Sequence, residues 1–234
     1  MLYGRDTYTG LPLPCLDFPP PPVTLASPIV FSKGNYMNIK KTVMAVAAAT
    51  LGMTVVTANA SAAGPGQFSY NYVEAQYFKT TTDVGIDVDA DIYGIRGSFK
   101  LNDTFFLTAG AAYGEVDIPV SNGIDVYDIG INARTSLSDK VDAYVGLSVT
   151  YAKVKVATFS DSDTGYGVTA GLRFAATDKI ELGASVTYVD VFDDNSTTLG
   201  LTARYKLTDK FSVGAGYTVA EDTTGYGIGI RLNF

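Results

Sequence analysis

The last nine residues of the chain alternate between apolar side chains and small or polar ones. The apolar positions are Tyr226, Ile228, Ile230, Leu232 and the terminal Phe234. Because successive side chains of a β-strand point to opposite faces, this alternation predicts a strand with one apolar face. About nine residues of tilted strand also span the hydrocarbon core of a bilayer. A last strand of this kind is typical of the closing strand of a membrane barrel and is not typical of the core of a soluble protein.

Four short segments with a central aspartate recur along the chain. They are residues 101–105, 137–141, 176–180 and 207–211, and their aspartates lie 36, 39 and 31 residues apart. Asp and Asn support tight turns by bonding to their own backbone, and the spacing fits one β-hairpin per repeat. Longer acidic connections are expected near residues 81–90, 118–124, 158–163, 192–196 and 221–224.

These turns and connections delimit ten predicted strands, with eight as the alternative. The predicted strands are 68–80, 90–101, 105–117, 124–137, 141–157, 164–176, 180–191, 196–207, 211–220 and 225–234. The first strand fits least well, because Phe68, Tyr70 and Tyr72 do not share the phase of Ala75 and Tyr77. A bulge or a later start of the strand would explain this difference. An even number of strands places both ends of the chain on the side of the short turns, as in bacterial barrels.

Aromatic residues gather near both ends of the predicted strands. The tyrosines at the loop end are Tyr77, Tyr93, Tyr113, Tyr127, Tyr151, Tyr166, Tyr188, Tyr217 and Tyr226. The opposite edge carries Phe99, Phe105, Phe174, Ile180, Tyr205, Phe211 and Phe234. Tyrosine is suited to the membrane interface, because its ring is apolar and its hydroxyl is polar. Strands of soluble β-sandwiches also alternate between apolar and polar side chains, but these proteins do not normally carry two such aromatic girdles. Residues 66–234 are therefore predicted to form an all-β, transmembrane, antiparallel up-and-down barrel with short periplasmic turns and longer extracellular loops.

Residues 37–60 have the three parts of a secretory signal peptide. Residues 38–41 are basic, residues 42–56 are apolar, and small residues offer cleavage after Ala60 or Ala62. A retained transmembrane helix is the alternative, but the apolar run is shorter than the roughly 18 residues that a span needs. We expect export through the inner membrane with cleavage of the signal peptide, and residence in the bacterial outer membrane.

Residues 1–36 precede the signal and contain seven of the nine prolines and the only cysteine, Cys15. This composition does not support a packed core. We expect a mis-assigned start, with translation beginning at Met37, and a proline-rich recognition arm is the alternative.

Residues 61–234 then carry 13 basic and 22 acidic residues, with neither histidine nor cysteine. This composition excludes disulfides and imidazole catalysis there, and the acidic balance gives no reason to expect nucleic acid as a partner.

The signal peptide, the alternating strands, the Asp-containing turns and the terminal Phe234 together resemble the small outer-membrane barrels of the OmpX, Ail and OmpA N-terminal domain group, within the porin-like superfamily. The resemblance covers roughly residues 66–234, and it departs in strand number, since the simple members have eight strands. It implies an architecture but not an activity, because this fold hosts adhesins, structural anchors and enzymes. The terminal aromatic strand resembles the signal read by the barrel-assembly machinery, and this makes Tyr226, Ile228, Ile230, Leu232 and Phe234 the expected assembly signal.

An arginine points inward from every second predicted strand, close to the short turns. The arginines are Arg96, Arg134, Arg173, Arg204 and Arg231, and the inward acids near their level are Glu74, Asp142 and Glu181. Buried charges need partners, so Arg134 is expected to pair with Asp142 and Arg173 with Glu181. One interpretation is a salt-bridge plug that fills the lumen. The other is an arginine-lined constriction that favours anions, and the many inward Gly, Ala, Ser and Thr residues leave space for a narrow channel.

The loops carry many acids, among which Asp87, Asp89 and Asp91 superficially resemble a calcium loop. The glycine and distal glutamate of an EF-hand are missing. Solvated loop charge is one interpretation, and loose divalent-cation contact that bridges to lipopolysaccharide phosphates is the other. We expect no dedicated metal site and no cofactor.

Catalysis is not expected, and we predict no catalytic residues. Barrel proteases, lipases and palmitoyl transferases of this class rely on histidine, which the chain lacks. The predicted function is a non-enzymatic structural or surface-interaction role in the envelope, with a small passive porin-like channel or a surface adhesin as alternatives. We expect contacts with outer-membrane lipids and lipopolysaccharide, transient contacts with the assembly machinery and periplasmic chaperones, and a monomeric protein.

Overall fold

The computed structural model of the protein describes residues 68–83, 87–117, 122–156 and 158–234. The predicted leader, the signal peptide and both candidate cleavage sites lie outside these residues. In the part of the chain that the structure describes, no helix has the length and hydropathy needed to cross a membrane.

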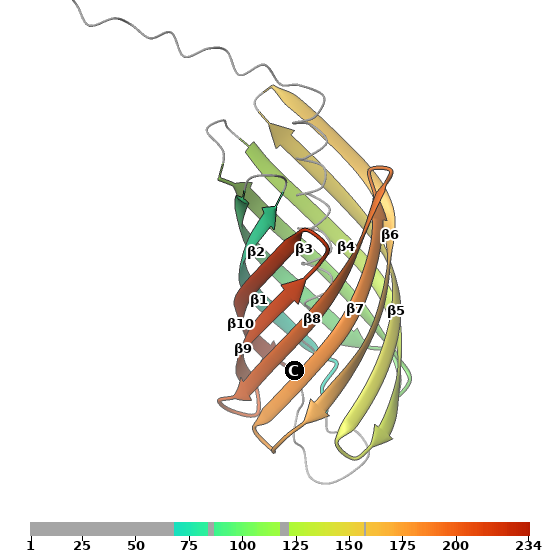
Figure 1. Cartoon of the computed structure of the whole chain (residues 1–234). Coiled ribbons are helices and arrows are strands. Elements are labelled where there is room, and N and C mark those ends of the chain that lie inside the picture. Colours follow the sequence, from blue (N-terminus) through green and yellow to red (C-terminus); the bar gives the residue numbers. More distant parts are fainter. Residues whose placement is uncertain (1–67, 84–86, 118–121, 157) are drawn as a thin grey trace, which may run out of the picture. The chain divides into compact units, whose positions relative to one another are not determined.

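Ten antiparallel strands form a closed barrel (Figure 1). The strands are β1 (Tyr72–Asp83), β2 (Asp87–Lys100), β3 (Phe105–Val116), β4 (Asn122–Ser138), β5 (Val141–Val156), β6 (Phe159–Ala175), β7 (Ile180–Val191), β8 (Asp194–Lys206), β9 (Phe211–Val219) and β10 (Thr223–Asn233). Each strand pairs with its neighbours in the chain, and β1 pairs with β10 to close the ring. The predicted architecture and the predicted count of ten strands are confirmed.

The connections differ from the prediction, because strands continue into segments that were expected to be loops. The connections at one end, which we call the loop end, are residues 84–86, 117–121, 157–158, 192–193 and 220–222. Those at the other end, the turn end, are residues 101–104, 139–140, 176–179 and 207–210. Among the loop-end connections, that of residues 117–121 is longer than the turns and the other four are not, which corrects the expected difference in length. Strand pairing satisfies the backbone groups that a long loop would leave to water, as in the part of β6 from Phe159 to Asp163 that pairs with β5.

The beginning of β1 explains the irregular phase of the first predicted strand. β1 starts at Tyr72, so Phe68 and Tyr70 precede it. All three of these aromatic side chains are buried inside the barrel, whereas Val73 faces outward. The later start, one of the two expected explanations, thus accounts for Phe68 and Tyr70, whereas Tyr72 is an inward position of β1 itself.

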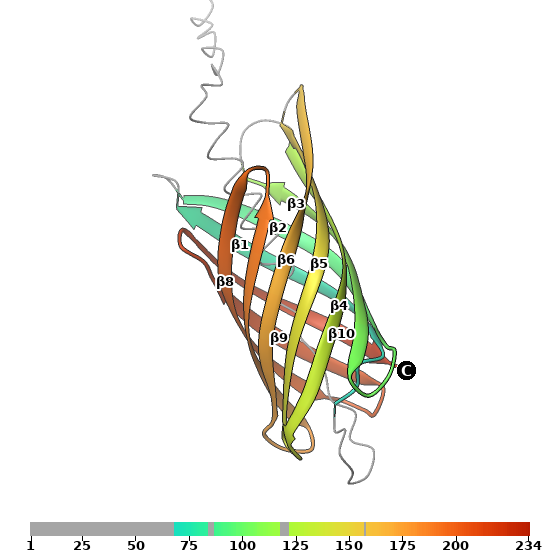
Figure 2. The same cartoon turned by 90° about the vertical axis from the view of Figure 1, so that its right-hand side faces the viewer.

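Two parts of the barrel differ in height. The tall wall, which we define as β4, β5 and β6, has strands of 16 and 17 residues. Its β5–β6 hairpin reaches furthest at the loop end in both views (Figures 1 and 2). The seam wall, defined as β8, β9, β10 and β1, contains strands of only 9 to 13 residues. The seam wall includes the contact between the first and last strands.

The outer surface follows the predicted alternation. Large apolar residues of every strand are exposed, as Ile129, Leu147 and Ile228 are, while their neighbours in the sequence face the interior. At the loop-end girdle, tyrosine rings of adjacent strands contact each other, with centroids 5.3 Å apart for Tyr77 and Tyr93. Exposed aliphatic and aromatic side chains between two aromatic girdles are what a hydrocarbon environment requires.

Candidate functional site

The five predicted arginines all lie inside the barrel near the turn end, and all five form ion pairs with buried carboxylates. The pairs are Arg96–Asp128, Arg134–Asp142, Arg173–Glu181, Arg204–Glu74 and Arg231–Glu74. No side chain of the set exposes more than 8% of its surface. We call these nine residues the lumen charge network.

Two of the pairs join neighbouring strands of a hairpin, as the sequence suggested. Arg134 Nη1 lies 3.0 Å from Asp142 Oδ2, and Arg173 Nε lies 3.0 Å from Glu181 Oε1. Asp142 also accepts hydrogen bonds from the hydroxyls of Ser136 and Tyr70, at 2.7 and 2.9 Å. The carboxylate of Asp142 therefore has three partners.

A third pair reaches across an intervening strand. Arg96 on β2 donates through Nη2 to Asp128 Oδ1 on β4, at 2.8 Å. Gly110 of β3 lies between them in the sheet register, and a Cβ atom there would come within 2.5 Å of Asp128 Oδ1. The absence of a side chain at Gly110 therefore makes this pair possible. Asp128 was missed among the predicted residues, although it shares the inward phase of Asn132.

Glu74 is the centre of the network at the closure of the barrel. It accepts from Arg231 Nε at 2.8 Å across the β1–β10 seam, where the two residues are register partners. It also accepts from Arg204 Nη2 at 2.6 Å. Arg204 belongs to β8, so its side chain extends over β9 and β10 to reach β1. Gly214 and Gly229 leave the necessary room, since a Cβ at Gly229 would lie 2.6 Å from Glu74 Oε1.

Aromatic side chains fill the spaces between these arginines. The Tyr70 ring lies 4.5 Å from the guanidinium carbons of both Arg134 and Arg173. Arg173 also contacts the Phe68 ring at 4.4 Å, and Arg231 contacts Tyr72 at 3.4 Å. Stacking of guanidinium on a ring face is favourable, more so when both groups are removed from water.

The segment that precedes β1 supplies the rings of Phe68 and Tyr70 and is held in place by hydrogen bonds. Ser98 Oγ donates to the Tyr70 carbonyl at 2.8 Å, and the Lys100 amide donates to Asn71 Oδ1 at 2.7 Å. The Tyr70 ring also contacts Phe106, with centroids 4.5 Å apart, and Phe106 contacts Tyr144. Phe68, Tyr70, Phe106, Tyr144 and Ala175 form one buried cluster. Together with the lumen charge network, this aromatic cluster occupies the turn-end half of the lumen.

Inward glycines do not leave the open space that their size suggests. A Cβ atom at Gly171 would lie 2.4 Å from the Tyr144 hydroxyl, and one at Gly227 would lie 2.1 Å from the Phe78 ring. The space left by each of these two glycines is therefore occupied by a long side chain of a neighbouring strand. Small inward residues, which by themselves favour a channel, here provide room for large side chains.

The three candidate cation-contact residues are not gathered around a common point. Asp89 forms an ion pair with Lys79 at 3.0 Å and accepts from the Thr81 hydroxyl at 2.7 Å. Asp91 accepts from the Tyr77 hydroxyl at 2.6 Å, and Asp87 begins β2. Within the described ranges, no group of three or more His, Cys, Asp or Glu side chains is placed to hold a metal ion.

The expected assembly signal is a lipid-facing row. Its five members Tyr226, Ile228, Ile230, Leu232 and Phe234 are all exposed on the outer surface of the last strand and its end. The interior positions of the same strand include Arg231 and Asn233, which are buried. One strand thus presents an apolar row to the bilayer and contributes a cation to the lumen.

The comparison with protein families agrees with this architecture. Residues 47–206 match the family model of the outer membrane protein beta-barrel domain. The chain therefore belongs to that family, and it is a β-barrel protein of the outer membrane.

Solved structures with a similar fold include a KdgM porin in complex with disordered oligogalacturonate (14% identity, TM-score 0.41), which covers 70% of this chain and 99% of its own. The N-terminal barrel of Pseudomonas aeruginosa OprF (17%, TM-score 0.37) covers 70% and 98%. Neisserial surface protein A (18%, TM-score 0.35) covers 71% and 98%. A search of curated protein sequences found no match. Similarity at this level assigns no particular role to the chain.

Proposed function

We propose that this protein is a non-enzymatic, non-conducting barrel with a structural or surface-interaction role in the outer membrane. The observation that carries the proposal is the combined presence of the lumen charge network and the aromatic cluster in the turn-end half of the lumen. Ten strands enclose an interior only somewhat wider than the eight-strand case, which side chains can fill. Here nine charged residues and the rings of Phe68, Tyr70, Tyr72, Phe106 and Tyr144 are buried inside the barrel.

The energetics also support closure. Buried charges are costly unless they are paired and hydrogen-bonded, and every arginine of the network has a carboxylate partner. A solute that passed this level would have to separate pairs such as Arg173–Glu181 and displace the rings that lie against the guanidinium groups. The network is thus better suited to holding the strands together than to conduction.

One observation favours the alternative, a small passive channel. The network contains five guanidinium groups and four carboxylates, and so carries one excess positive charge. In addition, among the described residues Arg204 Nε and Nη1 and the hydroxyls of Thr150 and Thr198 are buried without a hydrogen-bond partner. Bound water would satisfy them. A hydrated, cationic constriction would favour anions.

Planar-bilayer conductance of the purified, refolded protein separates the two functions. We expect no reproducible current steps from the wild-type barrel in a simple salt solution. Steps of uniform size that persist across preparations would contradict closure and establish the channel. Retention of the folded form in unheated gel electrophoresis serves as the control that the silent protein is inserted as a barrel.

The same proposal covers the remaining roles. The chain has no histidine to act as a general base, which supports a non-enzymatic role. Contact with lipopolysaccharide at the loop end, recognition of the last strand by the barrel-assembly machinery, and transient chaperone binding are expected of a protein of this class. Deletion of the loop-end segments with an assay of cell binding would distinguish an adhesin from a structural barrel.

A further inference from the structure

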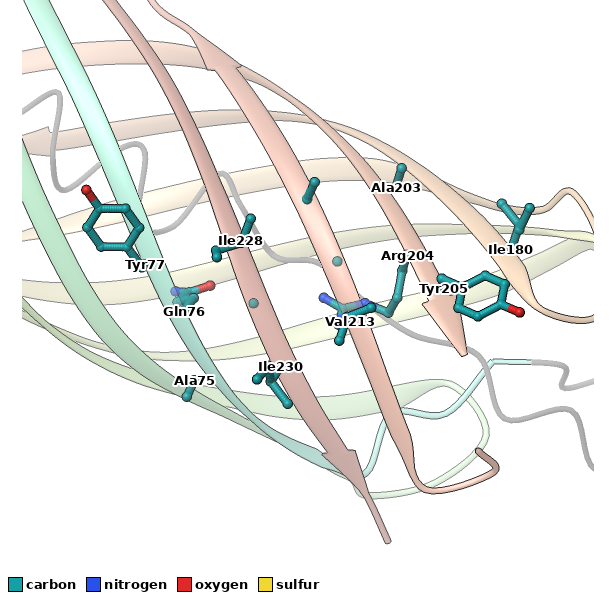
Figure 3. A pocket seen from close by; sticks show the side chains of 13 residues that line it. Ala75, Gln76, Tyr77, Ile180, Ala203, Arg204, Tyr205, Val213, Ile228 and Ile230 are labelled. Atoms are coloured by element: carbon teal, nitrogen blue, oxygen red, sulfur yellow. The ribbon is translucent and has the colours of Figure 1, made fainter. Parts of the chain in front are cut away.

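The outer surface of the seam wall, together with the beginning of β7, contains a groove of about 770 Å³ (Figure 3). Two rows of outward side chains run across the strands and border it. The first row consists of register partners on successive strands, in the order Ile180, Tyr205, Val213, Ile230 and Ala75. The row spans four interstrand steps, or about 19 Å at roughly 4.8 Å each.

The second row is formed by Ala203, Ala215, Ile228 and Tyr77, which are again register partners on successive strands. Two of its four members are alanines, whereas larger side chains such as Leu147 on β5 are exposed on other parts of the exterior. The groove exists because small outward residues lie here beside glycines of the same strands.

The floor of the groove is backbone. It consists of the strand segments at Arg204, Gly214, Gly229 and Gln76, whose side chains, where present, face the lumen. These residues form one continuous row of paired partners in the sheet. The ladder already uses their backbone groups, so the floor offers no backbone donors or acceptors to a peptide strand. The lining is accordingly suited to hydrocarbon.

The position of the groove indicates the source of that hydrocarbon. It begins at Ile180 and Tyr205 in the turn-end girdle and extends toward Tyr77 of the loop-end girdle, so it lies within the apolar band. Its length of about 19 Å is comparable with one leaflet of the hydrocarbon core, which is about 15 Å thick. The exposed lysines Lys179 and Lys210 lie in the two turns at its lower end, beside Asp178 and Asp209, and the ammonium group of a lysine donates hydrogen bonds to a phosphate.

We propose that this groove is a binding site for a phospholipid of the leaflet at the turn end, with one acyl chain in the groove and the phosphate near Lys179. The lipid fills a hollow that would otherwise lose dispersion contacts on one side. The site is independent of whether the lumen conducts, so its test does not depend on the proposed function. Its occupant would remain with the barrel longer than the lipids along the rest of the wall.

Native mass spectrometry of the refolded barrel with phosphatidylglycerol tests the proposal. The wild type is expected to retain one lipid under conditions that strip the others. The double variant Ala203→Leu/Ala215→Leu fills the groove and is expected to lower this retained fraction at least tenfold. The control variant Ala109→Leu adds the same side chain to an exposed outward alanine of β3 and is expected to behave as the wild type.

Three results would overturn the site. These are a wild type that retains no lipid preferentially, equal retention by the groove-filled and control variants, and a wild-type dimer that the groove-filling substitutions dissociate. The last result would assign the groove to a second copy of the chain. Substitution of leucine on a lipid-facing surface preserves apolar character, and the folded fraction of each variant is measured in the same samples by unheated gel electrophoresis.

Discussion

The seam wall and the tall wall face the same bilayer but are held together in different ways. In the tall wall, Arg134 and Asp142 are eight residues apart in the chain and lie on adjacent strands. In the seam wall, Glu74 binds Arg204 and Arg231, which are 130 and 157 residues away. The tall wall thus contains an ion pair within one hairpin, whereas the seam wall depends on a carboxylate that joins the first strand to the last two hairpins.

Glycines of the seam wall have a structural role that the composition of the chain does not indicate. In the seam wall, Gly214 and Gly229 let the Arg204 side chain cross two strands. Their backbone also forms part of the floor of the lipid-facing groove on the opposite side, beside the outward alanines Ala203 and Ala215. The small residues of the seam wall therefore leave room for an ion pair in the interior and for a groove on the exterior.

The largest expected effect concerns the shared carboxylate. Glu74→Gln leaves two buried guanidinium groups without a compensating charge, whereas Glu181→Gln leaves only Arg173. Breaking one buried pair costs about 3–5 kcal/mol, so Glu181→Gln is expected to lower the free energy of unfolding by about 3 kcal/mol and Glu74→Gln by about 5 kcal/mol or more. Urea titration of the barrel in lipid vesicles measures both. If the two substitutions lower the free energy of unfolding equally, the carboxylate shared by two arginines in the seam wall has no greater role than a carboxylate that serves one arginine.

A smaller effect is expected from a methyl group at the crossing point. Gly229→Ala places a Cβ atom 2.6 Å from Glu74 Oε1, which displaces the carboxylate from Arg204 and is expected to cost about 1–3 kcal/mol. The matched control is Gly97→Ala on β2, where the nearest atom would be 3.9 Å away. The same urea titration applies. If the two alanine variants unfold alike, the glycines of the seam wall have no role in accommodating the network.

The difference between the walls also explains what the sequence could predict. Period-two alternation and the recurrent Asp turns define strands and faces locally, and these predictions are confirmed in the ten-strand barrel. Arg134–Asp142 and Arg173–Glu181 follow from hairpin geometry, because partners on adjacent strands are separated by a countable number of residues. Phe68 and Tyr70 were recognised as out of phase, which is the local signature of residues that turn into the lumen.

The rest of the site depends on the closure of the ring, which no local pattern encodes. The alternation of side chains does not predict that Arg204 pairs with Glu74, since Glu181 is the register partner of Arg204 in β7. The pair Arg96–Asp128 likewise requires knowledge that Gly110 lies between the two strands. The short loop-end connections were mispredicted because acidic residues such as Asp161 and Asp163 are typical of loops, although here they lie in β6 and pair with residues of β5.

We propose that the aromatic cluster and the lumen charge network close the turn-end half of the lumen. The planar-bilayer conductance of Tyr70→Ala/Phe106→Ala, beside the control Tyr77→Ala/Phe105→Ala, tests this closure. Each variant removes one tyrosine and one phenylalanine, from the lumen in the first case and from the outer surface in the second. We predict current steps from the lumen variant alone, with a silent wild type and a silent control. Steps of the same size from all three proteins would contradict the claim.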